Sequence, residues 1–563
     1  MKLRFNKKFK RIALICALFS LFIIGTILIY IIPISVKIIP GQTVITDDGV
    51  TIYFNVYEPV NGDDVKNAII LGHGGSANKE FMKGYAIEMA AAGFVAVTLD
   101  FRGHGQSMGE IDFSLLANDV RAVKDKYLAE RGDINMSNLG YLGYSMGGWP
   151  GNEIVKEDEA FKCFILVGSS LLIKKNEIDN RSLNILMIQA RYDEAHTLEK
   201  TKGEMGAWLG MNGEAIDANK LYGDFNANAS KIYLDDNSDH LTLSWDTDFI
   251  REARNWVINT FDEVRAPEEN FFAHFRILIL IMQTFGGLGV FFLIIKPLSQ
   301  LIINPREGEV VKIEEPNESI SSLSKNIMLY SLVFGIPGML LMIWVLFVLP
   351  LVTAGLFTML LFGQAFGILL LLRKIAKNAK SSLKEYLMKP FKISRNSLLK
   401  HVVLGLILGG ILYLILILTF GLNYIGMIPS IIKIPWILIY FAFILFVVLI
   451  QGIFLQLIYQ TKLKSKSKGL TKTALFGFMS QIIYLYVFIL AFSMITNNYF
   501  TLIFLTIATP VTLLSSFVLV FLYKNSGNII AGAIIVAFII ICLLCTLAPF
   551  SFSIGSSAPY LSI

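Results

Sequence analysis

The sequence predicts two parts of different fold class, a mostly parallel sheet covered by helices and an all-α multi-pass transmembrane bundle. Of the 563 residues, 54% are hydrophobic and only 16% are charged, which excludes a disordered chain and an ordinary soluble enzyme. Residues 41–270 alternate between short β-branched runs and amphipathic stretches, whereas residues 275–550 consist mostly of long apolar runs. The two parts are therefore expected to face different solvents.

The charge distribution supports this division. The formal net charge of +6 averages two opposite regions. Residues 41–272 contain 21 basic and 37 acidic side chains, while the rest of the chain contains 28 basic and only six acidic ones. The basic charge lies beside apolar runs of membrane-spanning length, so we expect no nucleic-acid partner.

The N-terminus has the pattern of a membrane anchor. Residues 1–11 carry six positive charges and no acid, and the run 12–36 is uncharged. This run is longer than the apolar core of a signal peptide and ends without a convincing cleavage site. We therefore expect a basic cytoplasmic tail and a retained signal-anchor helix over 12–36, with a cleaved signal as the alternative.

Eight further spans are predicted after residue 272, each with the ~20 apolar residues that cross a bilayer. They cover residues 275–296, 327–350, 352–372, 402–421, 434–459, 473–495, 499–523 and 528–548. Two runs nearly touch at Pro350, where a re-entrant hairpin would give the same pattern. The glycine-rich stretches 286–289 and 405–410 are interpreted as helix-packing surfaces rather than cofactor sites.

Basic residues predict the orientation of these spans. With a cytoplasmic N-terminus, segment 373–400 lies inside and carries nine Lys or Arg against one Glu, and segment 461–472 carries five Lys. Segment 297–326 is less clear, with three basic residues against five Glu. The count predicts a multi-pass protein of the cell membrane whose acidic domain and C-terminal tail, residues 551–563, lie outside the cytoplasm.

The acidic domain is expected to contain a mostly parallel sheet covered on both faces, because strand-like runs alternate with helical patterns over ~230 residues. A helix is predicted over 113–131. The predicted strands cover 49–56, 68–71, 95–99, 139–143, 164–167, 185–189 and 231–234.

Three glycine-rich motifs follow predicted strands. The first, Gly143-Tyr144-Ser145-Met146-Gly147-Gly148, is a G-x-S-x-G pattern, in which a sharp turn from strand to helix exposes the serine hydroxyl. The second covers residues 71–76, and such a turn can direct a backbone N–H at a developing oxyanion. The third covers residues 100–107, Asp-Phe-Arg-Gly-His-Gly-Gln-Ser.

These three motifs, in this order, resemble the α/β-hydrolases, in the branch that includes small esterases, monoacylglycerol lipases and acyl-peptide-cleaving serine hydrolases. The resemblance covers about 230 residues and implies a triad in the chain order Ser, Asp or Glu, His. Of the six histidines, His73 and His104 precede Ser145, His196 lies too close to the expected acid, and His274 and His401 flank predicted spans. His240 remains, and it follows the last predicted strand of the domain, as this order requires. Asp193 matches the position of the acid, and Glu194 is the neighbouring alternative.

The resemblance implies catalytic roles for these residues. Ser145 is the expected nucleophile, His240 the general base and Asp193 the residue that fixes the imidazole tautomer. The backbone N–H groups of Met146 and of Gly75, or Ser76 in its place, are the expected oxyanion donors. His73 is interpreted as a residue that orders its loop, and the third motif as a brace for the site.

The expected function is a membrane-bound serine hydrolase acting on an ester, a lipid ester or an acyl-amide or peptide. An acyltransferase with the same triad, or a transporter or sensor with a non-catalytic ligand-binding domain, are the alternatives. No metal motif and no cofactor motif is present in the sequence, so none is expected. Small-molecule, lipid or peptide substrates and membrane lipids are the expected partners; the sequence leaves the oligomeric state open.

Overall fold

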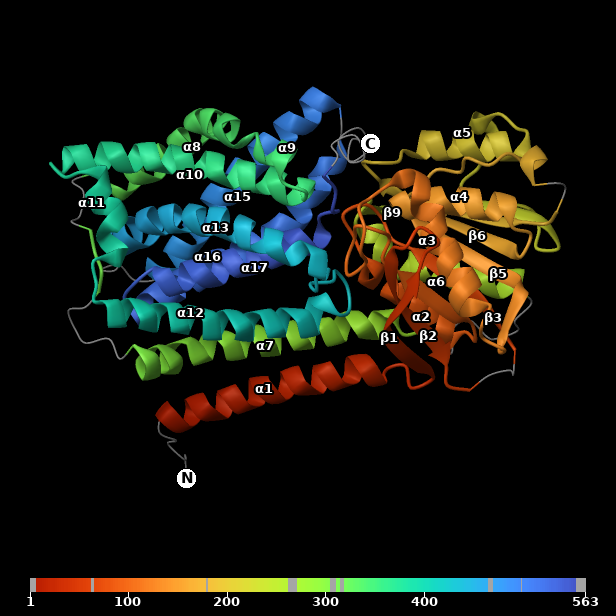
Figure 1. Ribbon diagram of the computed structural model, residues 1–563, viewed down its shortest axis with the longest axis horizontal. Helices are drawn as coiled ribbons and strands as arrows, with labels where there is room; N and C mark the ends of the chain where they lie inside the picture. The colour runs from red at the N-terminus through yellow and green to blue at the C-terminus, as the bar shows by residue number, and fades with distance from the viewer. Residues whose placement is uncertain are drawn as a thin grey trace. The chain divides into compact units, whose positions relative to one another are not determined.

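A computed structural model describes residues 7–61, 65–178, 181–261, 271–303, 310–313, 318–463, 469–497 and 499–552. The chain divides into two compact units. Figure 1 labels their helices and strands. The sheet unit contains Ile23–Gln283, Ile417–Ile432 and Thr546–Ile563. The helical unit contains Met1–Phe22, Thr284–Leu416 and Lys433–Cys545. The predicted parts 1–11, 41–270 and 551–563 each include residues outside the described ranges.

A single sheet of nine strands forms the centre of the sheet unit, in the order β1-β2-β4-β3-β5-β6-β7-β9-β8. The neighbours from β4 through β3, β5, β6 and β7 to β9 are parallel, and β1, β2 and β8 are antiparallel to their neighbours. The strands are β1 (Val36–Ile45), β2 (Thr51–Pro59), β3 (Lys66–Gly72), β4 (Val95–Leu99), β5 (Ile134–Tyr144), β6 (Phe161–Val167), β7 (Asn184–Tyr192), β8 (Leu221–Asp224) and β9 (Ala227–Asp239).

The mostly parallel sheet was predicted, but two of its strands were not. Strand β1 begins at Val36, the last residue of the predicted anchor run and before the predicted domain start at residue 41. The anchor helix α1 (Lys7–Ile31) ends before Pro33, since proline cannot donate a helical hydrogen bond and disfavours helix before it. Strand β8 is short and exposed, and therefore has no strong hydrophobic signal.

Helices cover both faces of the sheet (Figure 1). Helix α2 packs against α6, and α3 packs against α4. Right-handed crossovers place α2 and α3 on opposite faces, because the chain reverses its direction along the sheet after β4. The helices are α2 (Lys83–Ala91), α3 (Leu116–Val123), α4 (Gly148–Glu157), α5 (Leu198–Leu209) and α6 (Thr247–Thr260). The predicted helix 113–131 is a short turn, then α3, then a wider turn over Lys124–Leu128.

The core of the sheet unit consists of apolar side chains from the strands and from the helices above them. Ile70, Val97 and Leu166 on β3, β4 and β6 are fully buried. Strands buried on both faces explain why these segments read as continuous apolar runs. The core holds the carboxyl ends of β3 to β7 in fixed positions, where all three sequence motifs lie.

The described residues contain nine helices that are long and apolar enough to cross a membrane, as predicted. These spans are Phe9–Ile31, Ala273–Ile302, Ile320–Val348, Val352–Asn378, Arg395–Gly421, Ile431–Leu463, Gly469–Thr496, Ile503–Ser526 and Ile530–Leu547. They include α7 (Ala273–Ile302), α8 (Ile320–Met342), α9 (Val345–Val348), α10 (Val352–Asn378), α12 (Arg395–Leu416), α13 (Ile434–Gly452), α15 (Gly469–Thr496), α16 (Ile503–Ser526) and α17 (Ile530–Leu547). The short helix α11 (Leu383–Met388) lies in the basic segment 373–400.

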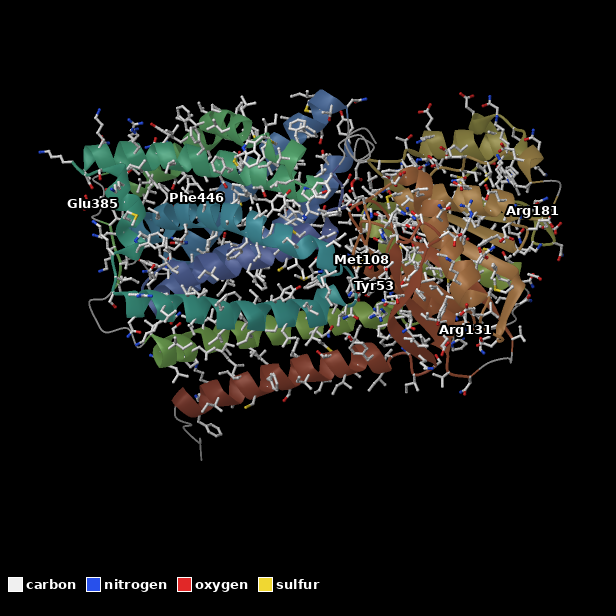
Figure 2. The ribbon with its side chains drawn as sticks, viewed as in Figure 1. Tyr53, Met108, Arg131, Arg181, Glu385 and Phe446 are labelled. Atoms are coloured by element: carbon white, nitrogen blue, oxygen red, sulfur yellow. The ribbon has the colours of Figure 1, made fainter. Side chains whose placement is uncertain are left out.

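Apolar side chains dominate these helices, while nitrogen and oxygen atoms are frequent on the sheet unit (Figure 2). The labelled Phe446 on α13 is 44% exposed, which suits a lipid-facing position. The glycine stretches pack helices closely, as predicted. A Cβ at Gly286 would lie 2.7 Å from the backbone N of Phe22, and one at Gly405 would lie 3.1 Å from Ala531 O. At Pro350 the helices break, and α10 packs along α8.

Candidate active site

The strand-to-helix turn after β5 presents Ser145 in a strained conformation. The φ of Ser145 is 50°, in the left-handed region that side chains other than glycine rarely adopt. The flanking glycines permit this turn, because a Cβ at Gly143 would overlap Gly147 and a Cβ at Gly147 would overlap Gly72. The sequence Gly143–Gly147 therefore meets a steric requirement of the turn, and the Ser145 side chain is partly exposed.

The structure brings Ser145, Asp193 and His240 together from the ends of β5, β7 and β9. His240 Nε2 lies 2.9 Å from Ser145 Oγ. His240 Nδ1 lies 2.9 Å from each carboxylate oxygen of Asp193. Asp193 and His240 are buried. The imidazole thus connects a hydroxyl to a carboxylate, which is the geometry that activates a serine.

The neighbouring acid, Glu194, has a different position. Its Oε2 accepts the backbone N–H of His240 at 3.3 Å, so it contacts the histidine's main chain and not its ring. On the other side, the Tyr144 hydroxyl donates to the His240 carbonyl at 2.9 Å. These two contacts fix the backbone of His240, and the sequence did not assign a role to Tyr144.

The charges around His240 raise its pKa. Burial disfavours the imidazolium, but the Asp193 carboxylate, which also accepts its hydrogen bond, and the Glu194 carboxylate outweigh that effect. The pKa of His240 therefore lies above its ordinary value of 6.5. Burial also raises the pKa of Glu194, although the backbone N–H groups near it act in the opposite direction.

Gly168 is a further requirement of the site that sequence reasoning missed. It follows β6 with a φ of 55°, and a Cβ there would lie 3.0 Å from Asp193 Oδ2 and 3.1 Å from His240 Nδ1. The same Cβ would lie 2.6 Å from Leu243 Cδ1. Only glycine leaves room for the pair behind it. The available signal was its position, because Gly168 directly follows the predicted strand 164–167.

The β3 loop (residues 73–78) passes beside the serine. A Cβ at Gly74 would lie 3.1 Å from Ser145 Cβ, so the loop backbone approaches the hydroxyl closely. Ser76 has a φ of 51°. The predicted oxyanion donor Gly75 lies between them, and the other predicted donor, Met146, follows Ser145 in the turn. Their donor roles stay predictions.

His73 orders this loop, as expected. Its Nδ1 lies 2.7 Å from Gly74 O, and its Nε2 accepts the backbone N–H of Phe101 at 3.1 Å. The second contact connects the β3 loop to the β4 loop (residues 100–107). His73 is fully buried and its ring stacks edge-on against His104 at 5.0 Å.

The β4 loop is held by two buried acids. Asp100 accepts both Lys79 Nζ at 2.6 Å and Lys79 N at 2.7 Å. Arg102 donates to Asp119, which is buried, and to Asp48. The Arg102 hydrogen bonds lower the pKa of Asp48 to about 2. The third motif therefore braces the neighbouring loop and does not touch Ser145 through any of these contacts.

One group of acids among the described residues has the spacing of a metal site. Asp235, Asp246 and Asp248 place carboxylate oxygens within 4.8 Å of one another. Asp246 already caps α6 by accepting the Asp248 N–H and also accepts the Ser238 hydroxyl. These contacts explain the position of Asp246 without an ion.

Residues 63–218 match the family described as serine aminopeptidase, S33. The sheet domain has the α/β-hydrolase fold. Solved structures similar to it include the Pyrococcus furiosus esterase Pf2001, with 16% identity over 40% of this chain and 94% of that chain, at a TM-score of 0.31. An esterase from Exiguobacterium antarcticum matches with 14% identity over 38% of this chain and 99% of that chain, at a TM-score of 0.29. No curated protein matches the chain.

Proposed function

We propose that this protein is a membrane-anchored serine hydrolase that cleaves an ester, a lipid ester or an acyl-amide or peptide through an acyl-Ser145 intermediate. The contact of His240 with both Ser145 Oγ and the Asp193 carboxylate is the observation that supports it. The match to serine aminopeptidases supports hydrolase chemistry in this domain. Substrates of this class include small molecules, lipids and peptides.

In the proposed acylation, His240 Nε2 accepts the Ser145 proton as Oγ bonds to the substrate carbonyl carbon. Asp193 holds the proton on Nδ1, which leaves Nε2 free to act as the base, and then stabilises the imidazolium. The carbonyl oxygen becomes an oxyanion that the N–H groups of Met146 and Gly75 stabilise. Collapse of the intermediate breaks the bond to the leaving group, which receives the proton from His240.

In the proposed deacylation, water takes the place of the leaving group. His240 removes a proton from the water, whose oxygen bonds to the acyl carbon, and returns that proton to Ser145 Oγ as the ester bond breaks. The product acid leaves and the serine is restored. An alcohol in place of water would give acyl transfer by the same steps.

We further propose that the domain lies outside the cytoplasm. Nine described helices could cross a membrane. The basic segment 373–400 extends from the end of α10 through α11, which suits the cytoplasmic side. Three of these helices lie in the sequence between the sheet domain and this segment, so the domain would be on the other side of the membrane. There it would meet extracytoplasmic substrates and membrane lipids.

Fluorophosphonate labelling tests the catalytic proposal. A fluorophosphonate reacts with an activated serine, so the folded wild-type protein should be labelled. Ser145→Ala should lose the label. Ser137→Ala, at an exposed position on the same strand β5, should keep it. Labelling that survives Ser145→Ala, or no labelling of folded wild type, would favour a non-catalytic ligand-binding domain.

Cysteine accessibility tests the orientation. Ser381→Cys lies in the basic segment and should not react with an impermeant maleimide in intact cells. Met211→Cys, whose parent side chain is 42% exposed in the sheet unit, should react. Reaction at position 381 but not at 211 would reverse the orientation. A screen of acyl chain lengths and aminoacyl esters would then define the substrate.

A further inference from the structure

One segment within the sheet unit comes from far along the chain. Residues 417–432, here named the strap, follow α12 and belong to the sheet unit. Ser430 N donates to Gly105 O at 2.8 Å, so the strap is bonded to the β4 loop. Asn78 Nδ2 donates to Ile425 O at 2.5 Å, so it is also bonded to the end of the β3 loop. The strap therefore contacts the β3 loop, which passes beside Ser145, and the β4 loop, which braces the β3 loop.

A buried lysine depends on the strap. Lys83 is 3% exposed, and its Nζ donates to Leu422 O at 2.6 Å and to Asn423 Oδ1 at 3.2 Å. Both acceptors belong to the strap. Burial of an ammonium group is costly unless hydrogen bonds and charges compensate for it. Burial lowers the pKa of Lys83 to about 8, while the Glu80 carboxylate acts in the opposite direction.

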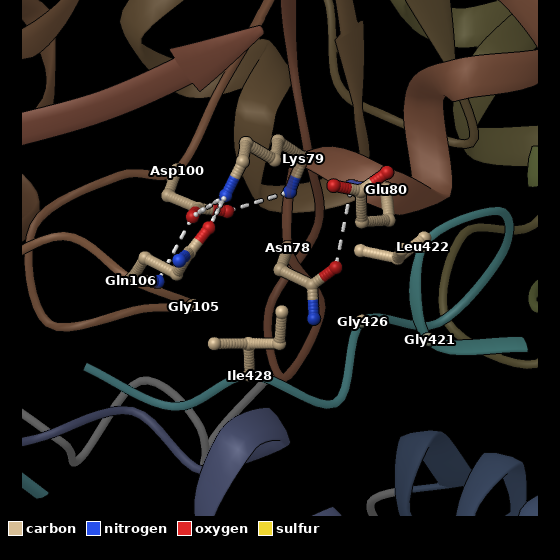
Figure 3. A pocket seen from close by; sticks show the side chains of 10 residues that line it. All are labelled: Asn78, Lys79, Glu80, Asp100, Gly105, Gln106, Gly421, Leu422, Gly426 and Ile428. Atoms are coloured by element: carbon tan, nitrogen blue, oxygen red, sulfur yellow. Dashed lines mark hydrogen bonds and ion pairs between the residues drawn. The ribbon is translucent and has the colours of Figure 1, made fainter. Parts of the chain in front are cut away.

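Asn78 is the residue at which the strap and the β3 loop meet. Its Oδ1 accepts the Glu80 N–H at 3.2 Å and so caps the turn Lys79–Met82, while its Nδ2 reaches the strap. Gly426 has a φ of 72°, and a Cβ there would overlap the Asn78 amide. Figure 3 shows Asn78 with Gly426 and Glu80 at a small pocket that the strap borders through Leu422 and Ile428.

The next residue extends this connection to the β4 loop. Lys79 bonds through both its main chain and its side chain to Asp100, and its Nζ also donates to Gln106 Oε1 at 2.7 Å (Figure 3). A second distant segment is hydrogen-bonded to the same loop. It covers residues 546–552 and is here named the clip. Phe550 N donates to Gly103 O at 2.8 Å, and Phe550 O accepts Ile111 N at 2.9 Å.

We propose that the strap is a positioning element for the oxyanion loop: its contact with Asn78 holds residues 73–78 where Gly75 can donate to the oxyanion. This proposal rests on the proposed serine-hydrolase function and extends it, because it makes a segment between two apolar helices part of the catalytic apparatus. The helical region would then do more than anchor the enzyme.

Asn78→Asp tests the contact in the full-length protein. The aspartate retains the oxygen that caps the Glu80 N–H but loses the Nδ2 donor, and it sets a carboxylate against Ile425 O. Asn212→Asp is the matched control, because Asn212 caps the turn Gly213–Ala215 by accepting Glu214 N, also at 3.2 Å, and is exposed.

Fluorophosphonate kinetics provide the catalytic readout. In Asn78→Asp we expect kinact to fall roughly 10- to 100-fold, since a displacement of about 1 Å near reacting groups can cost that much, with KI unchanged. Asn212→Asp should match wild type, and both variants are compared well below their thermal midpoints at the same concentration of folded protein. An unchanged kinact in Asn78→Asp, or a fall explained by an equal loss of folded protein, would overturn the proposal.

Hydrogen exchange separates failure of this proposal from failure of the catalytic one. Peptides covering residues 73–83 should exchange faster in Asn78→Asp than in Asn212→Asp, whether or not Ser145 reacts. Gly426→Ala, with Gly210→Ala as its control, should repeat the result. Gly210 has a φ of 70° but no atom within 4 Å of an added Cβ. Equal exchange of these peptides in the test and control variants would overturn the positioning role on its own.

Discussion

The two units bury different kinds of polar side chain. In the sheet unit the buried polar groups include many charges, among them Lys79, Lys83, Asp100, Arg102 and Asp119. In the described part of the helical unit, Lys433 at the start of α13 is the one buried Lys, Arg, Asp or Glu. The rest of the buried polar side chains there are amides, hydroxyls and the imidazole of His401.

The difference fits the environments proposed for the two units, water for the sheet unit and a bilayer for the helical unit. A charge in the sheet unit can be solvated by water until its partner arrives, and the final pair is fixed by hydrogen bonds, as with Asp100 and Lys79. A helix in a bilayer has no such solvent, so neutral partners such as Gln364 and Gln451 carry less risk. Two kinds of substitution test this interpretation: a neutral group in place of a buried charge in the sheet unit, and a charge in place of a buried neutral group in the helical unit.

The largest effect is expected where a neutral amide replaces the carboxylate of the site. Asp193→Asn should lower kcat by about 10⁴-fold, because an amide that donates to Nδ1 favours the tautomer whose Nε2 cannot accept the Ser145 proton. Ester hydrolysis kinetics would measure it. Glu194→Gln should have a much smaller effect, since its amide oxygen still accepts the His240 N–H. A larger loss in Glu194→Gln would assign the acid to Glu194.

This contrast also shows what the sequence could predict. The G-x-S-x-G motif predicted Ser145, and the chain order Ser, Asp, His that the family resemblance implies predicted Asp193 and His240. Gly168 and Tyr144 were missed, since their roles arise from atoms that approach only after folding. The strap was missed for the same reason: residues 417–421 appeared as the end of a span, and nothing local relates Leu422 to Lys83.

The second effect concerns a buried ion pair. Asp100→Asn should destabilise the sheet unit by about 3–5 kcal/mol, because three N–H donors converge on Asp100 and the buried Lys79 ammonium would lose its counter-ion. Chemical denaturation would measure the loss. Asp217→Asn, in the exposed pair with Lys220, should cost less than about 1 kcal/mol. Similar costs for the two would contradict the role given to burial.

The third effect reverses the exchange by placing a charge in the helical unit. Gln451 Nε2 donates to Gln364 Oε1 at 2.9 Å, and Gln364 Nε2 donates to Ser480 O. Gln451→Glu should cost roughly 2.5–3.5 kcal/mol, the cost of a charge within a membrane helix. Gln451→Leu should cost only about 0.6 kcal/mol, and at most about 1.7. Thermal unfolding in detergent would rank the two, and the opposite ranking would contradict the comparison.

The smallest effect is a change with pH. His240 must be neutral to accept a proton, and its pKa is raised, so activity should fall as the pH drops through a value above 6.5. Glu194→Gln removes one carboxylate that raises this pKa, so the acidic limb of the kcat/KM profile should move to lower pH. A limb that stays in place would remove Glu194 from the electrostatics of the site.

The distance along the chain between the strap and its partners constrains how the protein is made. Lys83 and Leu422 are separated by 339 residues, and Glu110 and Phe552 by 442. At the ~5–20 residues per second of protein synthesis, the first of these separations takes roughly 20–70 s. During that interval the nascent sheet unit carries an ammonium group awaiting its acceptors. The contacts within the sheet unit can therefore be completed only after the later apolar helices have been synthesised.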